Sequence, residues 1–455
     1  MRKFAIWAAS LAFGALGVSA CGGEGAPGSS ECADGSWAVP GAGCVAWTDC
    51  MPGEWEKEPG TATSDRVCLA CVSGLYSTET NAASCSAATQ CGTGYTEEIP
   101  PTPTSDRSCN IDEWERWFGT PMFESVYDIA TDADSNVYAV GVATASAVDH
   151  TLVSFIASYS RTGEQRWFHS IEGPYTGPQG AGIAVVGDAL YIGYPDARYE
   201  RRDLRGNLVW SKRIDAHSLN DLSVNSQGRG ALIARYPDYT TVIGFGSDGE
   251  VTWESEPVPP SSELYELALD DSGSVFATGI HYAPYADPEA LDALFVKKYQ
   301  DGGALAWDVE WETNVNTYSS LALGTDGQIY VLDLTDNPDF ERYLQQVRAD
   351  GSLGWRWHDT ARNFDGRMHV TGSEAGLLLC ASEDSQLSVD LIDYSGQSRW
   401  TYQVGSQTVD HGGAIATSPD GAIYLGGSST GDVGARFETQ GDASIARVLP
   451  FKHQE

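Results

Sequence analysis

The stretch DGQIYVL (326–332), followed by DGSLGW (350–355), holds the pattern that decides the fold. A polar turn leads into β-branched and aromatic residues, and a glycine then stands four positions before a tryptophan. Sequences like DGQIYVL recur at 135–141, 187–193, 227–234, 272–279, 374–380 and 420–426. The Gly-x-x-x-Trp motif occurs at Gly163–Trp167, Gly206–Trp210, Gly249–Trp253, Gly303–Trp307, Gly351–Trp355 and Gly396–Trp400. Tryptophan spacings of 43 to 54 residues indicate an internal repeat.

Each repeat reads as four short strands joined by tight turns. An apolar strand such as Leu267-Ala268-Leu269 comes first, the DGQIYVL-like strand second, and a third follows, as in 295–300. The tryptophan strand ends the unit, and no helical period is present. Four strands in about 40–50 residues are typical of a β-propeller blade. Glycine allows the turns, and we expect the six motif tryptophans to fill the gaps between neighbouring blades.

The two ends of the repeat array predict a closed ring. The last repeat stops after SIARVL (444–449), and a lone strand, Glu113-Trp114-Glu115-Arg116-Trp117, precedes the first repeat. Pairing 113–117 with 444–449 completes the last blade and removes both open edges. We therefore predict an all-β fold, a seven-bladed propeller of four-stranded antiparallel blades. Six or eight blades are the alternatives, because the spacing of 54 residues holds long insertions.

The repeats resemble those of pyrroloquinoline-quinone-type propellers and of bacterial seven-bladed repeat proteins, which share the Gly…Trp and D-G-x-[IV]-Y patterns. The quinoprotein resemblance implies an axial cofactor pocket with a metal-binding carboxylate and stacked aromatic groups, but it assigns none of these residues here. A related precedent, the outer-membrane assembly propeller lipoprotein, binds proteins without catalysis. We expect no cofactor, metal or catalytic residue, and keep a quinoprotein-like oxidoreductase as the alternative.

Eight cysteines lie between residues 32 and 110, where apolar residues are sparse. The segment is an internal duplication, because TATSDRVC (61–68) returns as TPTSDRSC (102–109). Exported segments without a core use disulfides, each worth roughly 2–4 kcal/mol. Guided by the repeat, we predict sequential pairs, with pairs crossed within each half as the alternative. The predicted pairs are Cys32–Cys44, Cys50–Cys68, Cys71–Cys85 and Cys91–Cys109. A zinc site on Cys68 and Cys71 is the competing interpretation, although a second C-x-x-C is missing.

The run 47–77 resembles the cysteine-rich repeats of tumour-necrosis-factor-receptor-type ectodomains. The resemblance extends over the duplicated segment, where each repeat holds four cysteines instead of the receptor's six. It implies the scaffold and no particular ligand. We expect a disulfide-stapled stalk, with a recognition module as the alternative.

The first thirty residues predict export and a lipid anchor. Met1-Arg2-Lys3 and the apolar run 4–18 are typical of a signal peptide. Val18-Ser19-Ala20-Cys21 resembles a bacterial lipobox, which implies cleavage before Cys21 and acylation of its thiol; an ordinary secretory signal is the alternative. Gly22 favours the outer membrane, facing the periplasm or the cell surface. The expected parts are a signal peptide (1–20), a flexible tether (21–31), disulfide repeats (32–110) and the propeller (111–451).

The chain of 455 residues carries 27 Lys and Arg against 63 Asp and Glu, a net charge of −36. A surface of this sign repels nucleic acids and anionic headgroups, so nucleic acid is excluded as a partner and acyl chains are the expected membrane contact. We expect a monomer that acts as an envelope binding or scaffolding protein for an unknown protein or glycan. The acidic, aromatic loop 281–292 is the first choice for that contact.

Several motifs suggest chemistry but are better explained by structure. Gly427–Gly431 spells G-x-S-x-G without the strand-to-helix turn of a nucleophile elbow. Asp132–Asn136 opens like a calcium loop but lacks its later glycine and glutamate. Cys380 is expected to be a buried thiol, with a redox or crosslinking role as the alternative. We expect packing of the remaining tryptophans between blades, with sugar or peptide binding as the alternative, at Trp114, Trp117, Trp311 and Trp357. No pair of histidines has metal-ligand spacing among His150, His169, His217, His281, His358, His369, His411 and His453.

Overall fold

The computed structural model describes residues 32–92, 95–118, 124–144, 152–171, 182–283, 291–313, 315–335, 341–359, 368–383, 386–404, 410–429 and 442–449. These residues form strands and turns, and none of them lies in a helix with the length and apolarity needed to cross a membrane. The chain divides into two compact units, Met1–Cys91 with Glu97–Asn110, and Gly92–Thr96 with Ile111–Glu455. Cys21, the expected signal peptide and the tether lie outside the described residues.

The described strands between residues 32 and 111 form four two-stranded sheets. They are β1 (Ser36–Val39) with β2 (Gly43–Ala46), β3 (Glu54–Glu58) with β4 (Val67–Ala70), β5 (Leu75–Tyr76) with β6 (Ser86–Ala87), and β7 (Tyr95–Ile99) with β8 (Ser108–Ile111). Most side chains here are exposed or half-buried, so covalent links replace a core. The disulfides follow the sequential scheme, Cys32–Cys44, Cys50–Cys68, Cys71–Cys85 and Cys91–Cys109. Cys68 and Cys71 therefore belong to separate disulfides and share no zinc site.

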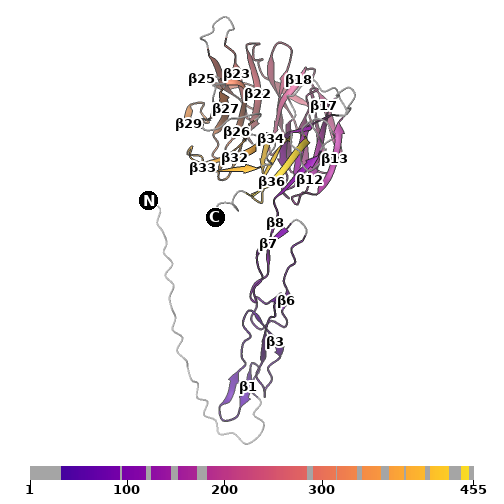
Figure 1. Ribbon diagram of the computed structural model, residues 1–455, viewed down its shortest axis with the longest axis vertical. Coiled ribbons are helices and arrows are strands. Elements are labelled where there is room, and N and C mark those ends of the chain that lie inside the picture. Colours follow the sequence, from indigo (N-terminus) through magenta and orange to yellow (C-terminus); the bar gives the residue numbers. More distant parts are fainter. Residues whose placement is uncertain are drawn as a thin grey trace. The chain divides into compact units, whose positions relative to one another are not determined.

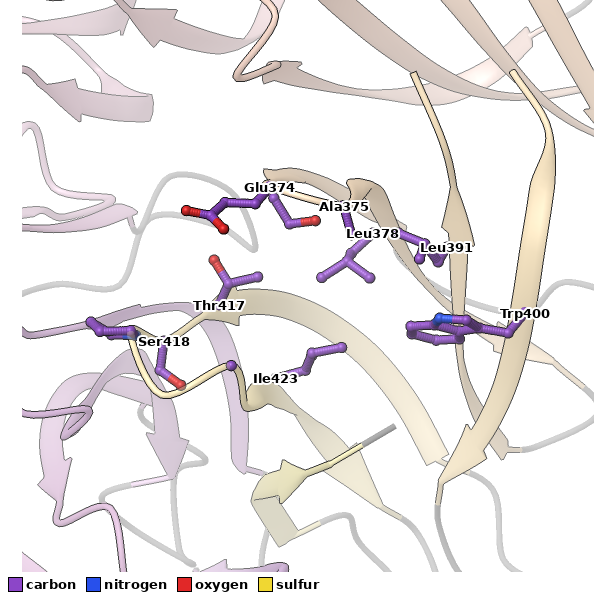
Figure 2. Close-up of a pocket in the computed structure, with 11 residues that line it drawn as sticks. Glu374, Ala375, Leu378, Leu391, Trp400, Thr417, Ser418 and Ile423 are labelled. Atoms are coloured by element: carbon purple, nitrogen blue, oxygen red, sulfur yellow. The ribbon is translucent and has the colours of Figure 1, made fainter. Parts of the chain in front are cut away.

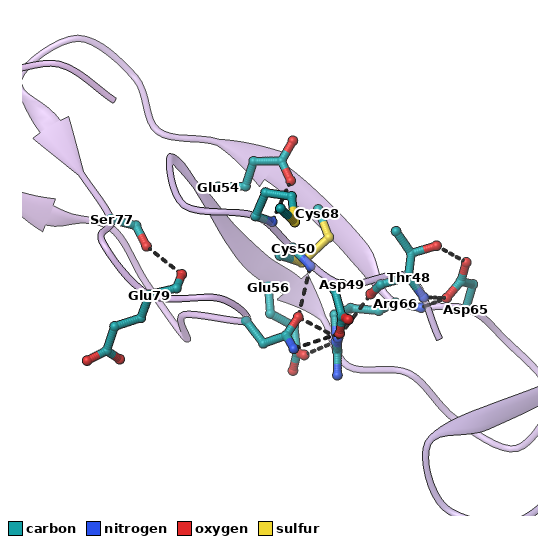
Figure 3. The surroundings of a disulfide bond; sticks show 12 residues. Thr48, Asp49, Cys50, Glu54, Glu56, Asp65, Arg66, Cys68, Ser77 and Glu79 are labelled. Atoms are coloured by element: carbon teal, nitrogen blue, oxygen red, sulfur yellow. Dashed lines mark hydrogen bonds and ion pairs between the residues drawn. A yellow bond between two sulfur atoms is a disulfide. The ribbon is translucent and has the colours of Figure 1, made fainter. Parts of the chain in front are cut away.

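The duplicated Ser-Asp-Arg motif fixes the chain beside a disulfide in each repeat, and Figure 3 shows the first copy. Asp65 accepts hydrogen bonds from the backbone and the hydroxyl of Thr48, at 2.7 and 2.6 Å, and Arg66 donates to the Thr48 carbonyl at 2.9 Å. Hydrogen bonds from Thr48 hold the pKa of Asp65 below its ordinary value. In the second copy, Asp106 accepts the same two bonds from Thr89, at 2.8 and 2.6 Å. The repeated Ser-Asp-Arg sequence thus forms the same turn in both copies.

The second unit is a ring of seven four-stranded antiparallel sheets, which confirms the predicted propeller. Blades 1 and 2 are β10 (Glu124–Thr131), β11 (Val137–Thr144), β12 (Leu152–Tyr159) and β13 (Gln165–Ile171), then β14 (Gly182–Val186), β15 (Ala189–Gly193), β16 (Arg198–Asp203) and β17 (Leu208–Arg213). Blades 3 and 4 are β18 (Ser218–Val224), β19 (Gly230–Arg235), β20 (Thr240–Phe245) and β21 (Val251–Glu254), then β22 (Ser262–Leu269), β23 (Val275–His281), β24 (Asp292–Tyr299) and β25 (Leu305–Thr313). Blades 5 and 6 are β26 (Val315–Leu323), β27 (Ile329–Thr335), β28 (Arg342–Val347) and β29 (Leu353–Asp359), then β30 (His369–Ser373), β31 (Gly376–Glu383), β32 (Gln386–Ile392) and β33 (Ser398–Val404). Blade 7 comprises β34 (Asp410–Thr417), β35 (Ile423–Ser429), β36 (Asp442–Val448) and β9 (Trp114–Phe118).

Blade 7 takes its outermost strand from the beginning of the propeller. β9 pairs antiparallel with β36, with Phe118 opposite Ala443 and Trp114 opposite Arg447. This confirms the predicted closure. The first strand of each blade contacts the first strand of the next, and β34 contacts β10, so the first strands surround the ring axis (Figure 1).

One tryptophan per blade links successive blades, at contacts that we call seams. In six seams the ring packs against a positive-φ glycine in the turn before the fourth strand of the following blade. The pairs are Trp114–Gly163, Trp167–Gly206, Trp210–Gly249, Trp253–Gly303, Trp307–Gly351 and Trp355–Gly396. In five of these seams the indole N–H also donates to that turn, as from Trp355 to the Tyr394 carbonyl at 3.1 Å. Trp400 is the tryptophan at the seam between blades 6 and 7.

Replacing Gly351 by alanine is expected to destabilise the propeller by about 1–2 kcal/mol more than the same change at Gly327. Both glycines lie in turns of blade 5 with positive φ, +87° and +76°, so the two variants share the backbone strain. A methyl group at Gly351 would lie 3.0 Å from Cδ2 of Trp307. A methyl group at Gly327 would have no atom other than those of its chain neighbours within 4 Å. Urea unfolding of both variants measures the difference, and equal losses would contradict a tightly packed seam.

Candidate functional site

Seven equivalent residues, one on the first strand of each blade, lie around the ring axis. Each is followed by a buried aliphatic residue, as in Asp128-Ile129, whose backbone pairs with the second strand of its own blade. We call these seven the axial positions; they hold Asp128, Gly182, Asp221, Glu266, Ser320, His369 and Ala414. Three carboxyl groups and one imidazole therefore belong to the same narrow ring, which makes it the first place to look for chemistry.

Four of the axial side chains hydrogen-bond their blade to the next. The donor is the backbone N–H of the residue after the next axial position. The bonds run from Ile183 to Asp128 (2.8 Å), Leu267 to Asp221 (2.8 Å), Leu321 to Glu266 (3.1 Å) and Val370 to Ser320 (3.1 Å). An inner strand has no sheet partner on the axis side, so its N–H groups need acceptors from elsewhere. The axial side chains supply them.

Two of the aspartates accept a second bond, from the residue that directly follows each of them. These bonds run from Ile129 to Asp128 (2.8 Å) and from Leu222 to Asp221 (2.7 Å). The preceding blades have Ala414 and Gly182 at their axial positions, and neither residue has a side-chain acceptor. Aspartate, with two acceptor oxygens, serves both its own strand and the next one. Hydrogen bonding within and between blades thus explains the two aspartates.

The axial carboxyl groups hold their protons more tightly than exposed ones. Burial raises the pKa of Asp128 to about 7, and burial with repulsion from Asp128 raises the pKa of Asp221 to about 8. Burial and the charge of Asp221 raise the pKa of Glu266 well above its ordinary value, although its side chain is 20% exposed. His369 Nδ1 lies 3.9 Å from Glu266 Oε1. The backbone donors favour the ionised carboxylates, but desolvation outweighs them. The axial carboxyl groups accept hydrogen bonds from backbone N–H groups, so these residues hold the inner strands together.

Replacing Asp221 by asparagine is expected to flatten the pH dependence of propeller stability. The folded-state pKa of Asp221, about 8, lies above the ordinary value of 3.8, so the folded protein binds more protons between these values. The contribution of Asp221 to the free energy of unfolding should therefore fall as pH rises from about 4 to about 8. We expect Asp221→Asn to lack this contribution, so that it loses about 2 kcal/mol less stability than the wild type over this range.

Urea unfolding at pH 5 and pH 8 measures this difference. The matched control is Asp238→Asn, which removes an exposed carboxylate in blade 3 and should leave the pH dependence as in the wild type. Parallel pH profiles for Asp221→Asn and the wild type would mean that the axial carboxyl groups titrate normally.

The other motifs singled out in the sequence lie in structural surroundings. Residues 132–136 form a turn in which Asp132 accepts from the N–H groups of Asp134 and Asn136, at 3.0 and 2.9 Å. Residues 427–429 belong to β35, and residues 430 and 431 lie outside the described part. Cys380 is buried in β31, outside the four disulfides. Within the described residues, no group of three or more His, Cys, Asp and Glu side chains is arranged to hold a metal ion.

The predicted contact loop starts from a polar and aromatic rim. Arg235 of blade 3 pairs with Glu263 of blade 4 at 2.6 Å. The hydroxyl groups of Tyr265 and Tyr282 hydrogen-bond to each other, and each lies 3.4 Å from Glu263. Tyr282 is 38% exposed. Residues 284–290 of the loop lie outside the described residues.

Sequence reasoning missed the axial residues and Arg447, a buried residue of β36 whose guanidinium donates to Asp420 and to the Asp112 carbonyl. The axial acids did carry a signal, because Asp128, Asp221 and Glu266 each precede an aliphatic and a small residue on a first strand. An acid at the same place in three repeats is a positional pattern that single-repeat motifs do not reveal. Arg447 carried no such signal, since blade 7 alone needs a residue that joins two chain ends.

The cysteine-rich unit matches the TNFR/NGFR cysteine-rich region over residues 32–68. No curated protein matches the chain in sequence. Among solved structures, the chain is similar to virginiamycin B lyase from Staphylococcus aureus, with 11% identity over 74% of this chain and 100% of that one, at a TM-score of 0.49. The Pan2 WD40 domain from Neurospora crassa (12% identity, 71% of this chain, 89% of that one, TM-score 0.48) and U3-55K (9%, 73%, 98%, 0.49) are also similar. No TM-score reaches 0.5, so no property of these proteins is transferred.

Four disulfides and a receptor-like repeat suggest an exported protein. A propeller joined to such a module fits a binding or scaffold role.

Proposed function

We propose that this protein is a lipid-anchored binding or scaffolding protein of the bacterial cell envelope, without catalytic activity. The observation that carries the proposal is the role of the axial carboxyl groups. A reaction site on the axis would need these groups, but their oxygens accept hydrogen bonds from backbone N–H groups of neighbouring blades. The rims and seams of the ring are then the surfaces on which a partner can act.

The anchor is tested by acylation. Cells that express the chain are labelled with a palmitate analogue, and the wild type is expected to carry the label and to sediment with membranes. Cys21→Ser should lose both properties, whereas Cys380→Ser, which alters a buried thiol, should keep them. Labelling that persists in Cys21→Ser would contradict the lipid anchor.

The binding role is tested by crosslinking in envelope extracts. The rim of Arg235, Glu263, Tyr265 and Tyr282 offers exposed aromatic surface beside charge, a composition that is common in protein interfaces. We expect Tyr282→Ala to weaken capture of a defined protein or glycan at least tenfold, while Tyr239→Ala, on the neighbouring turn of blade 3, leaves it unchanged. Capture that is equal with and without Tyr282 would place the contact elsewhere.

The cysteine-rich unit is the alternative recognition element. It has a hollow of about 360 Å³ lined by Trp55, Leu69, Val72 and Leu75, and Val72 is 68% exposed. Binding assays on residues 22–110 and 111–455 separate the alternatives, because only the unit that carries the contact should retain the partner. The quinoprotein alternative predicts a spectral or thermal shift on titration with pyrroloquinoline quinone and calcium, and such a shift would overturn the non-catalytic proposal.

A further inference from the structure

The fourth strand of each blade lies at the outer edge of its sheet. These strands are β13, β17, β21, β25, β29, β33 and β9, and Figure 1 shows several of them on the outside of the ring. Alternate backbone N–H and C=O groups of an edge strand point away from its sheet, where an extended segment of another protein can pair with them. The side chains of each fourth strand therefore decide which segments can approach it.

β17 (Leu208–Arg213) differs from the other six fourth strands in charge. It contains Lys212 and Arg213 and no acid, whereas each of the others contains at most one cation. β25, in blade 4, contains three acids instead. Most of the chain shares the acidic character of β25, since its net charge is −36. β17 is therefore the most cationic edge of a strongly acidic protein.

The neighbouring strand and turn extend this positive charge. Residues 198–213 hold six of the chain's 27 Lys and Arg, against two acids. Both acids are engaged, because Glu200 is buried and Asp203 accepts two backbone N–H groups of its own turn, at 2.9 Å each. Arg205 and Arg213 are exposed, and no ion pair joins either of them to another described residue. The outer surface of blade 2 therefore presents cations to solvent.

An exposed aliphatic pair accompanies these cations. Leu208 and Val209 are 54% and 55% exposed at the start of β17. The strand bulges here, since Leu208 pairs with Arg202 and Trp210 with Arg201. Apolar side chains on an open edge promote pairing with other strands, and natural proteins protect such edges with charges. On this acidic chain cations attract acidic strands, so their effect at β17 is selection rather than general protection.

We propose that β17 is a binding site for an extended acidic segment of a partner protein, which adds to blade 2 as a fifth strand. Backbone pairing is argued from the edge position of β17, and the acids are argued from Arg205 and Arg213. Aliphatic residues between the acids would cover Leu208 and Val209. At about 0.15 M ionic strength the Debye length is about 8 Å, so the segment senses these cations more strongly than the acids elsewhere on the surface.

The cavity between blades 6 and 7 is a second apolar surface, and it has the opposite charge (Figure 2). It measures about 350 Å³, and Trp400 and Leu378 of blade 6 face Ile423 of blade 7 across it. Glu374 is exposed and is the charged member of its described lining. An acidic segment would be repelled there, so Ala375→Trp, which fills this cavity, is a control for apolar binding elsewhere on the ring.

The inference adds a contact surface and a ligand class to the proposed binding role and rests on that role only for its biological meaning. Its test uses purified components, so failure here leaves the anchor and the rim contact untouched. The probe is a fluorescent peptide of sequence Gly-Glu-Val-Glu-Val-Glu-Val-Glu-Gly. The readout is fluorescence anisotropy with the purified full chain at about 0.15 M ionic strength.

We expect saturable binding that weakens at least tenfold in Arg213→Glu, which reverses an exposed charge, and in Leu208→Asp, which removes exposed apolar surface and adds an acid. The matched control is Arg399→Glu, which makes the same charge reversal on the fourth strand of blade 6. This control and Ala375→Trp should each change affinity less than twofold. Thermal melting of each variant confirms that the propeller is folded.

Two N-methylated peptides separate strand addition from attraction between charges. One is methylated at the backbone nitrogens of its valines and the other at those of its inner glutamates. Each methyl group removes a backbone donor and leaves the net charge unchanged. Only one set of alternate N–H groups can face β17, so one peptide should bind at least tenfold more weakly and the other within about threefold of the unmodified probe.

Four results would overturn the proposal. The first is the absence of saturable binding to the wild type, and the second is an equal loss in Arg213→Glu and Arg399→Glu. The third is equal binding of the unmodified and both methylated peptides, since the edge would then attract any polyanion by charge alone. The fourth is concentration-dependent association of the wild type that Arg213→Glu abolishes in sedimentation velocity. The occupant would then be the acidic β25 of a second copy.

Discussion

A chain that begins at residue 119 is expected to lose cooperative folding of the propeller, whereas a chain that begins at residue 111 retains it. The difference between the two is β9, which supplies the fourth strand of blade 7. Without it, β36 presents an unpaired edge, and the turn of blade 1 that holds Gly163 loses the indole that covers it. Trp114 is only 8% exposed. Burial of one tryptophan side chain contributes roughly 4–6 kcal/mol, so the total loss should exceed about 5 kcal/mol.

Circular dichroism and thermal melting of the two chains measure this effect, with size-exclusion chromatography to detect association through the open edge. A synthetic peptide of residues 110–118, added in excess, should restore the melting transition of the shorter chain by strand addition. Equal stability of the two chains would mean that the ring does not depend on its closing strand. Rescue by a scrambled peptide would show that the added strand acts without the register seen in β9.

Much of this architecture can be read from the repeats because propeller blades use the same local solutions many times. Gly351 and Trp355 stand in one strand-turn pattern whose copies reveal the blade, and the unpaired strands at 113–117 and 444–449 reveal the closure. The disulfide scheme is likewise local, since each bond closes a loop of 12 to 18 positions inside one repeat.

The features that the sequence did not reveal are those that depend on neighbours in the ring. The role of Asp221 depends on Gly182 in the blade before it and on Leu267 in the blade after it, and no single repeat contains all three. The role of Arg447 depends on Asp112, whose carbonyl it contacts although Asp112 lies more than 300 residues earlier in the chain. Both are consequences of closing a repeat into a circle.

Replacing Arg447 by methionine is expected to destabilise the propeller by about 3 kcal/mol. Arg447 lies on β36 and is 1% exposed. Its guanidinium donates to Asp420 Oδ2 at 2.9 Å and to the Asp112 carbonyl at 3.2 Å. One side chain thus joins the last strand, the first turn of blade 7 and the segment that leads into β9. Removing it would leave the Asp112 carbonyl and the Asp420 carboxylate without this donor.

The interactions of Asp420 show how the stability lost in Arg447→Met can be divided between its causes. Burial alone would raise the pKa of Asp420, but hydrogen bonds from Ser418 and the attraction of Arg447 hold it below its ordinary value. In Arg447→Met the carboxylate keeps its desolvation cost and loses its counter-charge. The double variant Arg447→Met, Asp420→Asn should therefore recover about 1 kcal/mol of the loss, because the partly buried charge is gone.

Urea unfolding of the wild type, the two single variants and the double variant completes the cycle. Arg399→Met serves as the control, because Arg399 is 54% exposed and pairs with Asp393 at the surface, where such pairs contribute little. We expect this control to lie within about 0.5 kcal/mol of the wild type. A loss in Arg447→Met as small as the control would mean that β9 holds its place through backbone pairing and Trp114 alone. A loss of the expected size instead identifies Arg447 as the polar contact that joins the two ends of the propeller where no turn connects them.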